Sequence, residues 1–169
     1  MNILALPGIN PKTAGWATNL LNELAGPERI MKVQRYKHWD CEGSEQCLNL
    51  DEEVQRLQDC AVDLLIAKSL GVMVGLQACA KGYINPHRAV LIGTPVIDFR
   101  QSALDLRQLT ANLAIPVLFI QQTGDVVGSC ASLRAEVGDV AMVQLVEIPG
   151  DNHQYKDLKL LARHIKKLL

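Results

Sequence analysis

The chain has 169 residues, of which 49% are hydrophobic and 21% are charged, the balance of an ordinary globular protein. This length accommodates one sizeable core and leaves no room for a second, so we expect a single domain over residues 1–169. Lys and Arg number 17 and Asp and Glu number 18, for a formal net charge of −1. This near-neutral balance, with only 4% aromatic residues, argues against nucleic-acid and anionic-membrane binding.

The N-terminal sequence and the cysteines both bear on location. Residues 1–8 carry no basic segment followed by a long apolar stretch, and no apolar run is long enough to span a bilayer. The five cysteines are odd in number, widely spaced and without a C-x-x-C pair. These features predict reduced thiols in a cytoplasmic protein, with no metal site built from cysteine.

Short apolar runs alternate along the chain with longer segments of helical period. Six of these runs are predicted strands: residues 2–6, 29–36, 63–67, 88–93, 116–121 and 141–148. The predicted helices are residues 13–25, 51–61, the apolar segment after Ser69, 103–113, 129–137 and 155–169. Several strands are continuously aliphatic, which is typical of parallel strands covered by helices on both faces. The alternation predicts an α/β fold with a mostly parallel sheet of about six strands flanked by helices.

A serine at a tight turn is the strongest local signal. Residues 64–73 read Leu-Leu-Ile-Ala-Lys-Ser-Leu-Gly-Val-Met, so a buried strand runs into a turn with Ser69 at its tip and then into an apolar helix. This is the context of the nucleophile elbow G-x-S-x-G, where small residues let strand and helix pass close together. Gly71 keeps the second glycine, and Ala67 replaces the first. For the turn taken alone, an ordinary helix-capping serine is the alternative.

Two further loops that follow strands supply an acid and a base. Asp125 ends the segment Gln-Gln-Thr-Gly-Asp, and His153 ends the segment Pro-Gly-Asp-Asn-His. Loops that follow parallel strands meet at one edge of the sheet, where ligands bind. The order Ser, Asp, His along the chain is one in which catalytic triads occur. We therefore predict a triad in which His153 takes the proton of Ser69 and Asp125 orients the imidazole.

Other titratable side chains compete for these roles. His87 precedes a strand and His164 lies inside the last helix, so neither is delivered to the site. Asp98 and Asp40 also follow strands and are the alternative acids, with Asp98 the stronger of the two. Lys68 is a conceivable base, but with a histidine in place we expect its side chain to be solvated or salt-bridged.

Backbone amides are expected to bind the oxyanion that develops during acyl transfer. The amide of Leu70 follows the nucleophile directly, and that of Ile9 lies in the loop after the first strand, where Gly8 allows a close approach. Candidate pocket-lining residues are Asn10, His38, Thr94 and Val96, the last two within an apolar wall over 94–97. The proposed chemistry calls for no metal and no organic cofactor.

Four segments together resemble the α/β-hydrolase superfamily: Leu6-Pro7-Gly8, Ala67-Lys68-Ser69-Leu70-Gly71, residues 116–125 and residues 149–153. The resemblance covers nearly the whole chain and is nearest to short members without a lid, such as the retinoblastoma-binding-protein-like serine hydrolases and small bacterial hydrolases. It implies a single α/β-hydrolase domain without a lid domain. One departure is Gln122, where the family often has a glycine three residues before the acid. Because only residues 94–102 separate a strand from the next predicted helix, we expect an open, shallow site.

The sequence therefore predicts a serine hydrolase, of carboxylesterase or thioesterase type, that cleaves a small acyl substrate through an acyl-enzyme on Ser69. A catalytically weak or inactive protein of the same fold, serving as a binding or scaffold module, is the alternative. Acyl transfer on the same fold is a third interpretation. A nucleotide-binding enzyme is disfavoured, because neither G-x-G-x-x-G nor the P-loop motif occurs.

Overall fold

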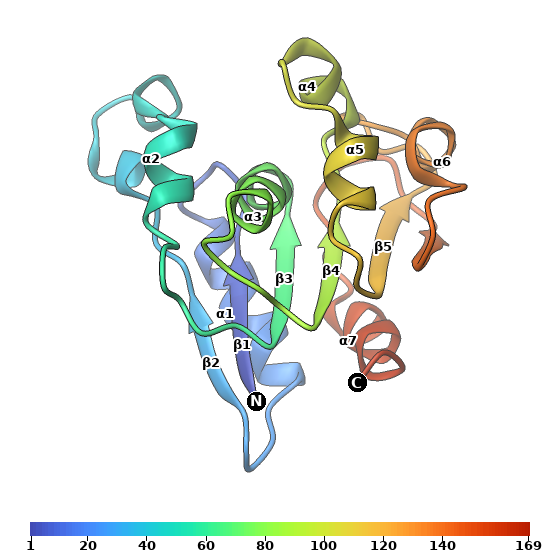
Figure 1. Ribbon diagram of the computed structural model, residues 1–169, viewed down its shortest axis with the longest axis horizontal. Helices are drawn as coiled ribbons and strands as arrows, with labels where there is room; N and C mark the ends of the chain where they lie inside the picture. Colours follow the sequence, from blue (N-terminus) through green and yellow to red (C-terminus); the bar gives the residue numbers. More distant parts are fainter.

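A computed structural model describes residues 1–169, with the side chains of residues 44 and 45 left out. At its centre lies a sheet of six strands whose neighbours all pair in parallel. In chain order the strands are β1 (Asn2–Leu6), β2 (Ile30–Val33), β3 (Leu64–Lys68), β4 (Arg88–Ile92), β5 (Val117–Gln122) and β6 (Val143–Ile148). Their order across the sheet is β2-β1-β3-β4-β5-β6 (Figure 1). The predicted parallel α/β sheet is confirmed.

Helices cover both faces of this sheet. They are α1 (Thr13–Glu23), α2 (Leu50–Gln55), α3 (Leu70–Ala80), α4 (Val96–Gln101), α5 (Leu106–Ala111), α6 (Cys130–Val137) and α7 (Leu158–Lys166), with short 3-10 helices η1 (Lys37–Asp40) and η2 (Ser44–Cys47). Helices α1 and α7 pack together on one face, and α2, α3, α5 and α6 lie on the other. Helix α4 lies beyond the carboxyl ends of the strands, at the top of Figure 1.

The sheet separates two apolar cores, because alternate side chains of a strand point to opposite faces. In β3, Leu65 and Ala67 belong to the core under α3, whereas Leu64 and Ile66 belong to the core under α1 and α7. Each fully buried Leu or Ile side chain stabilises the fold by roughly 1.5–3 kcal/mol. The same alternation turns Lys68, the last residue of β3, toward the side of α1 and α7.

The structure differs from the sequence prediction in two connecting segments. Residues 94–102, expected to be a loop, contain helix α4, whose Val96 and Phe99 are buried at helical spacing. A three-residue apolar spacing in so short a segment is too weak a pattern to reveal a helix. The helix predicted over 51–61 ends earlier as α2, and turns follow in which Asp59 takes a left-handed φ of 62°.

The cysteines also differ from the prediction. Cys41 and Cys47 form a disulfide with their Cα atoms 6.4 Å apart, so the expectation that all five thiols are reduced is wrong for this pair. The two meet because the chain turns back between them at Gly43, whose φ is 70°. The other three, Cys60, Cys79 and Cys130, are free thiols. The expectation of a cytoplasmic location assumed five reduced cysteines, and the Cys41–Cys47 disulfide removes that support.

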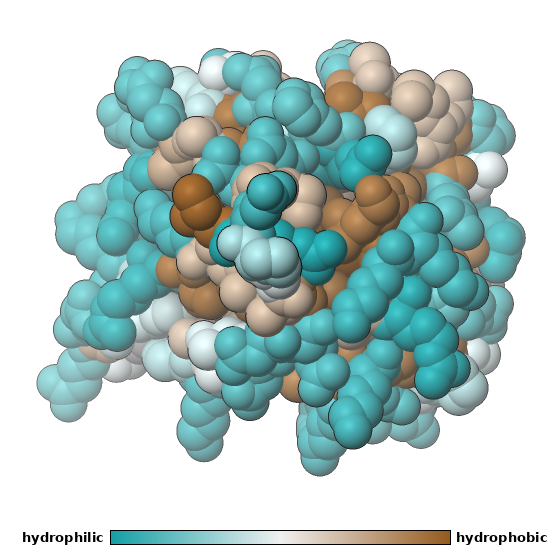
Figure 2. Space-filling view, turned by 90° about the horizontal axis from the view of Figure 1, so that it is seen from below, coloured by the Kyte–Doolittle hydropathy of each residue, from teal (hydrophilic) through white to brown (hydrophobic). Residues whose placement is uncertain are grey.

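The end of the molecule at the amino ends of the strands is largely polar. Figure 2 views this end, where hydrophilic side chains cover most of the surface and apolar ones gather near its middle. No helix in the described part of the chain is long and apolar enough to cross a membrane. The loops that carry the predicted site lie at the opposite end, beyond the carboxyl ends of the strands.

Candidate active site

Ser69 stands on a sharp turn between β3 and α3. Its backbone angles, φ 53° and ψ −119°, lie in a region that residues with a side chain rarely adopt, so the turn is strained. The turn also brings the start of α3 against the end of β1. The approach is so close that a Cβ added to Gly71 would lie only 2.1 Å from the carbonyl oxygen of Leu6. Ala67, on the other side of the turn, is completely buried. These are the features expected of a nucleophile elbow.

Three side chains form a continuous hydrogen-bonded chain at this edge of the sheet. Nε2 of His153 lies 2.9 Å from Oγ of Ser69, and Nδ1 of His153 lies 2.9 and 2.8 Å from the two carboxylate oxygens of Asp125. The Asp125 side chain is 0% exposed and that of His153 is 18% exposed. The structure thus brings together the serine, the histidine and the acid that the sequence singled out.

The alternative acids do not reach the imidazole nitrogen in this way. Asp40 forms an ion pair with Arg35 at the surface. Asp98 lies exposed on α4; partial burial raises the pKa of its carboxyl, and the charge of His153 acts in the opposite direction. Asp98 is therefore close enough to interact electrostatically with His153. The hydrogen bond to Nδ1 of His153 is made by Asp125.

Asp125 is kept ionised by the hydrogen bonds around it. Burial alone raises the pKa of its carboxyl, but donors from His153, Tyr155 and Val127 outweigh that effect and leave the pKa below its ordinary value. The Tyr155 hydroxyl donates to Oδ2 at 2.7 Å, and the Val127 amide donates to Oδ1 at 2.9 Å. An ionised carboxylate at this position can orient the imidazole and stabilise its protonated form.

Two residues that sequence reasoning missed join the acid loop to the base loop. The Tyr155 hydroxyl, besides donating to Asp125, accepts from the amide of Gln122 at 3.0 Å. Oε1 of Gln122 accepts from the amides of Asn152 and His153 at 3.1 and 3.2 Å. Gln122, which departs from the family pattern, is thus the residue that ties β5 to the histidine loop. Its signal was a polar side chain ending an otherwise apolar strand.

The loop after β1, which carries the predicted oxyanion amide of Ile9, passes beside the serine. A Cβ added to Gly8 would lie 3.5 Å from Cβ of Ser69, so the loop backbone passes directly beside the nucleophile. The Thr13 hydroxyl lies 3.0 Å from the carbonyl oxygen of Gly8 and 2.5 Å from that of Asn10, so it ties the start of α1 to both ends of this loop. Among the described residues, the amides of Ile9 and Leu70 have no acceptor assigned to them.

His38 is buried inside the molecule against this loop. It is only 3% exposed, and its Nε2 is 3.0 Å from the carbonyl oxygen of Ile9. Trp39 donates from Nε1 to the same oxygen at 2.7 Å. Oε1 of the buried Glu53 lies 3.4 Å from Nδ1 of His38 and accepts from the amide of Lys37 at 2.7 Å. The predicted pocket-lining histidine therefore supports the loop after β1 from inside the molecule.

The other three predicted lining residues have mainly structural contacts. Asn10 is exposed, and its side chain accepts from the amide of Lys12 at 3.0 Å within the turn. Thr94 is buried, and its backbone bonds to the Gln121 side chain in both directions, at 2.8 and 3.2 Å. Val96 is also buried, and it packs against the backbone at Gly128. Of the three, Val96 also lines a cavity, the one beside α4.

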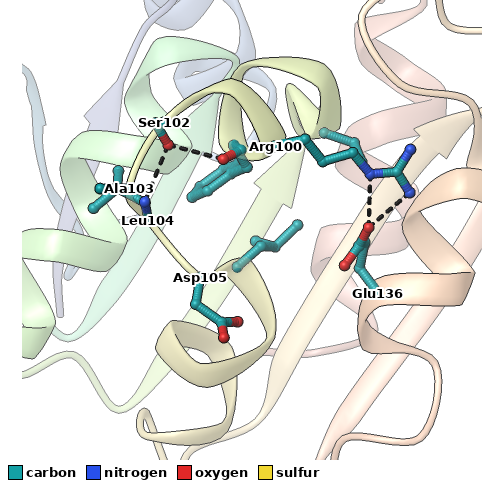
Figure 3. Close-up of a pocket in the computed structure, with 9 residues that line it drawn as sticks. Arg100, Ser102, Ala103, Leu104, Asp105 and Glu136 are labelled. Carbon is teal, nitrogen blue, oxygen red and sulfur yellow. Dashed lines mark hydrogen bonds and ion pairs between the residues drawn. The ribbon is translucent and has the colours of Figure 1, made fainter.

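A cavity of about 350 Å³ lies beside α4, between this helix and α5 and α6 (Figure 3). Arg100 spans it to Glu136, with Nε and Nη2 at 2.8 and 2.7 Å from Oε1. Ser102 donates to the carbonyl of Phe99 at 2.9 Å and is thereby occupied. Among the described residues, neither Ser69 nor His153 lines this cavity. Ser69 itself is partly exposed.

Lys68 is placed differently from the sequence prediction. Its side chain was expected to be solvated or salt-bridged, but the residue is 5% exposed. Nζ donates to the carbonyl oxygen of His153 at 3.1 Å and lies 5.5 and 5.6 Å from the ring centroids of Trp16 and Tyr155. Burial lowers the pKa of this ammonium group to about 8, against the attraction of Asp125. The prediction failed because strand alternation turns the side chain inward.

No protein-family model matches the chain, and no curated protein matches its sequence. Among solved structures, it is similar to a YdeN-like hydrolase from Pectobacterium atrosepticum, with a TM-score of 0.67 and 16% identity over 100% of this chain and 93% of the other. A lipase-esterase related protein from Clostridium acetobutylicum gives a TM-score of 0.65 and 16% identity over 99% and 94%. The RedJ thioesterase of the Streptomyces coelicolor prodiginine pathway gives 0.60 and 14% over 99% and 85%. The chain has the α/β-hydrolase fold, without a lid over its described residues.

Proposed function

We propose that this protein is a serine hydrolase that cleaves a small ester or thioester through an acyl-enzyme on Ser69. One observation carries the proposal: Ser69, on a strained elbow, is hydrogen-bonded at 2.9 Å to an imidazole whose other nitrogen is held by a buried carboxylate. The named activities of the structurally similar proteins, a hydrolase, a lipase-esterase related protein and a thioesterase, belong to the same class and support it.

Acylation would begin at the serine hydroxyl. His153 accepts the hydroxyl proton at Nε2 while Oγ of Ser69 attacks the substrate carbonyl carbon. Asp125 stays ionised and stabilises the imidazolium, consistent with the lowered pKa of its carboxyl. The imidazolium then returns the proton to the departing alcohol or thiol, which leaves an ester on Ser69.

The carbonyl oxygen becomes negatively charged during this step. The amides of Ile9 and Leu70 are the proposed donors to it, one from the loop after β1 and one from the first residue of α3. Two donors hold the Ile9 carbonyl from behind, so the loop needs little reorganisation when the charge develops. Water, deprotonated by His153, then attacks the acyl-enzyme and releases the acid.

The surroundings of the serine favour a small acyl group. Ile97 and Val126 are apolar side chains that are 42% and 66% exposed. Val126 follows Asp125, and the amide of Ile97 donates to the carbonyl of Val127 at 3.0 Å, so both belong to the rim of the acid loop. Exposed apolar side chains on this loop offer contact to a small acyl group. We therefore keep the short, lidless hydrolases as the nearest proposed relatives and a small acyl compound as the proposed substrate.

Labelling with a fluorophosphonate probe, read by intact mass and peptide mapping, tests the proposal. We expect one adduct on Ser69 that is lost in Ser69→Ala and retained in Ser102→Ala, a control serine whose hydroxyl bonds to the Phe99 carbonyl. Heating the protein before labelling should also abolish the adduct. A folded wild-type protein that takes no label would contradict the proposal and favour the binding or scaffold role.

A further inference from the structure

Lys68 is a buried cation that the proposed reaction does not use. It immediately precedes Ser69, but strand alternation directs its side chain away from α3 and toward α1 and the loop before α7. There Nζ lies between the ring of Trp16, on α1, and the ring of Tyr155, at 5.5 and 5.6 Å from their centroids. Contact with two aromatic rings offsets part of the desolvation of a buried ammonium group.

The loop that this cation contacts has an unfavourable backbone conformation. His153 and Tyr155 have φ values of 58° and 55°, in the left-handed region that residues other than glycine seldom occupy. Such a conformation persists only where surrounding groups fix it. Nζ of Lys68 donates to the carbonyl of His153 at 3.1 Å, and Nε1 of Trp16 donates to the carbonyl of Tyr155 at 2.9 Å. Each strained residue thus has its carbonyl held by a side chain from another element.

The backbone amide of His153 is held by a neutral side chain, that of Gln122. Oε1 of Gln122 accepts from the His153 amide at 3.2 Å. The His153 backbone is therefore bonded in two directions, at its amide by β5 and at its carbonyl by the residue before the nucleophile. The second contact links the position of the base directly to the position of the serine.

We infer that Lys68 is a positioning residue, which holds the histidine loop so that Nε2 of His153 meets Oγ of Ser69. This inference rests on the proposed function and adds to it a residue that acts through His153. Without the contact, the loop can relax toward ordinary backbone angles and the hydrogen bond between His153 and Ser69 lengthens. Proton transfer would then slow, while the rim that contacts substrate would be unchanged.

The side chain at position 68 can be varied while its length is kept. Lys68→Met removes the charge and the donor but fills a similar volume, and Lys68→Arg keeps the charge. Ile165→Val, in the same core on α7, is the matched control, because it loosens packing there without removing a hydrogen bond to the His153 loop. With all variants folded, we expect Lys68→Met to label about 10- to 100-fold more slowly, Lys68→Arg to recover much of the rate and Ile165→Val to match wild type.

The pH profile gives a readout that a merely structural role would not move. The titratable groups facing Lys68 are Asp125, His153 and Tyr155, and burial raises the pKa of Tyr155, so its hydroxyl stays neutral. The lowered pKa of Lys68, about 8, means that the ammonium persists below that pH and is lost above it. Wild-type labelling should therefore decline above about pH 8. Lys68→Met and Lys68→Arg, which cannot lose a proton there, should lack this decline.

The outcomes separate the inference from the proposed function. If wild type labels and Lys68→Met labels as fast with the same pH profile, the positioning role is wrong and the serine-hydrolase proposal stands. If wild type does not label, the proposed function fails, and proton NMR of the His153–Asp125 hydrogen bond decides the role of Lys68. A low-field signal displaced in Lys68→Met but not in Ile165→Val would support it, and an unchanged signal would overturn it.

Discussion

At the scale of single residues, exposure to solvent decreases along the hydrogen-bonded chain from the serine to the acid. Ser69 is partly exposed, His153 is 18% exposed at its side chain and Asp125 is 0% exposed. This gradient lets substrate reach the hydroxyl while water is kept from the carboxylate, whose pull on the imidazole is stronger in a low-dielectric setting. Tyr155 and Val127 complete the shell of donors around the acid and keep its pKa low.

Replacing the acid tests this arrangement. Asp125→Asn leaves the shape intact but presents an amide that can stabilise the wrong imidazole tautomer. If the triad operates as proposed, ester hydrolysis should fall by up to about 10⁴-fold, with the midpoint of thermal unfolding much less affected. Hydrolysis of a small chromogenic acetate ester measures the first quantity. Asp98→Asn is the comparison: a larger loss there than at Asp125 would assign the acid role to α4.

At the scale of elements, the elbow depends on how closely α3 crosses β1. A Cβ on Gly71 would meet the backbone carbonyl of Leu6, which cannot swing away as a flexible side chain can. The same crossing places the first amide of α3 beside the serine. The spacing of Ser69 and Gly71 is therefore a packing requirement as well as a sequence motif.

Two glycine substitutions separate this close contact from ordinary helix propensity. Gly71→Ala should lower the free energy of unfolding by about 1–3 kcal/mol or more, because helix and strand must move apart. Gly15→Ala, on α1 where nothing lies within 4 Å of the added Cβ, should raise it by about 0.5–1 kcal/mol. Urea unfolding measures both. Equal effects at the two positions would mean that the crossing is looser than the structure indicates.

Much of the element pattern could be read from the sequence, and the exceptions have physical causes. The aliphatic runs of β3, β4 and β5 identify buried strands, because both faces of such strands must be apolar. Helix α4 escaped detection since its six residues bury only Val96 and Phe99. The Cys41–Cys47 disulfide escaped because a count of thiols cannot show which side of a turn each one faces.

At the scale of the whole molecule, the strand order collects loops that are distant in sequence. Ser69, Asp125 and His153 follow β3, β5 and β6, and an all-parallel sheet brings all three ends to the same edge. Helix α4 lies beyond this edge, and no lid domain is evident among the described residues. The cavity beside α4 is lined by α4, the segment after it, the start of α5 and Glu136 of α6, and Ser69 is not among its lining residues.

Acyl-chain preference follows from this shape. If the proposed site, which has no lid, encloses only a small acyl group, each added methylene of a longer chain stays largely in water and contributes little binding. We expect kcat/KM for a series of nitrophenyl esters to be highest for acetate to butyrate and to gain nothing beyond that length. Values of kcat/KM that rise steadily to long acyl chains would contradict the proposed small acyl substrate and would mean that a groove encloses the chain.

The sequence by itself determined the α/β class, the strand-turn-helix around Ser69 and the order of acid and base, because these depend on local apolar periodicity and on which loops follow strands. Only the tertiary structure decided how the site is held. Lys68, Gln122, Tyr155 and His38 act through contacts with residues 15 to 85 positions away, such as the bond from Lys68 to His153 and that from His38 to Glu53. Contacts of that kind leave no periodic trace along the chain, since they arise only once parallel strands bring distant loops to one edge.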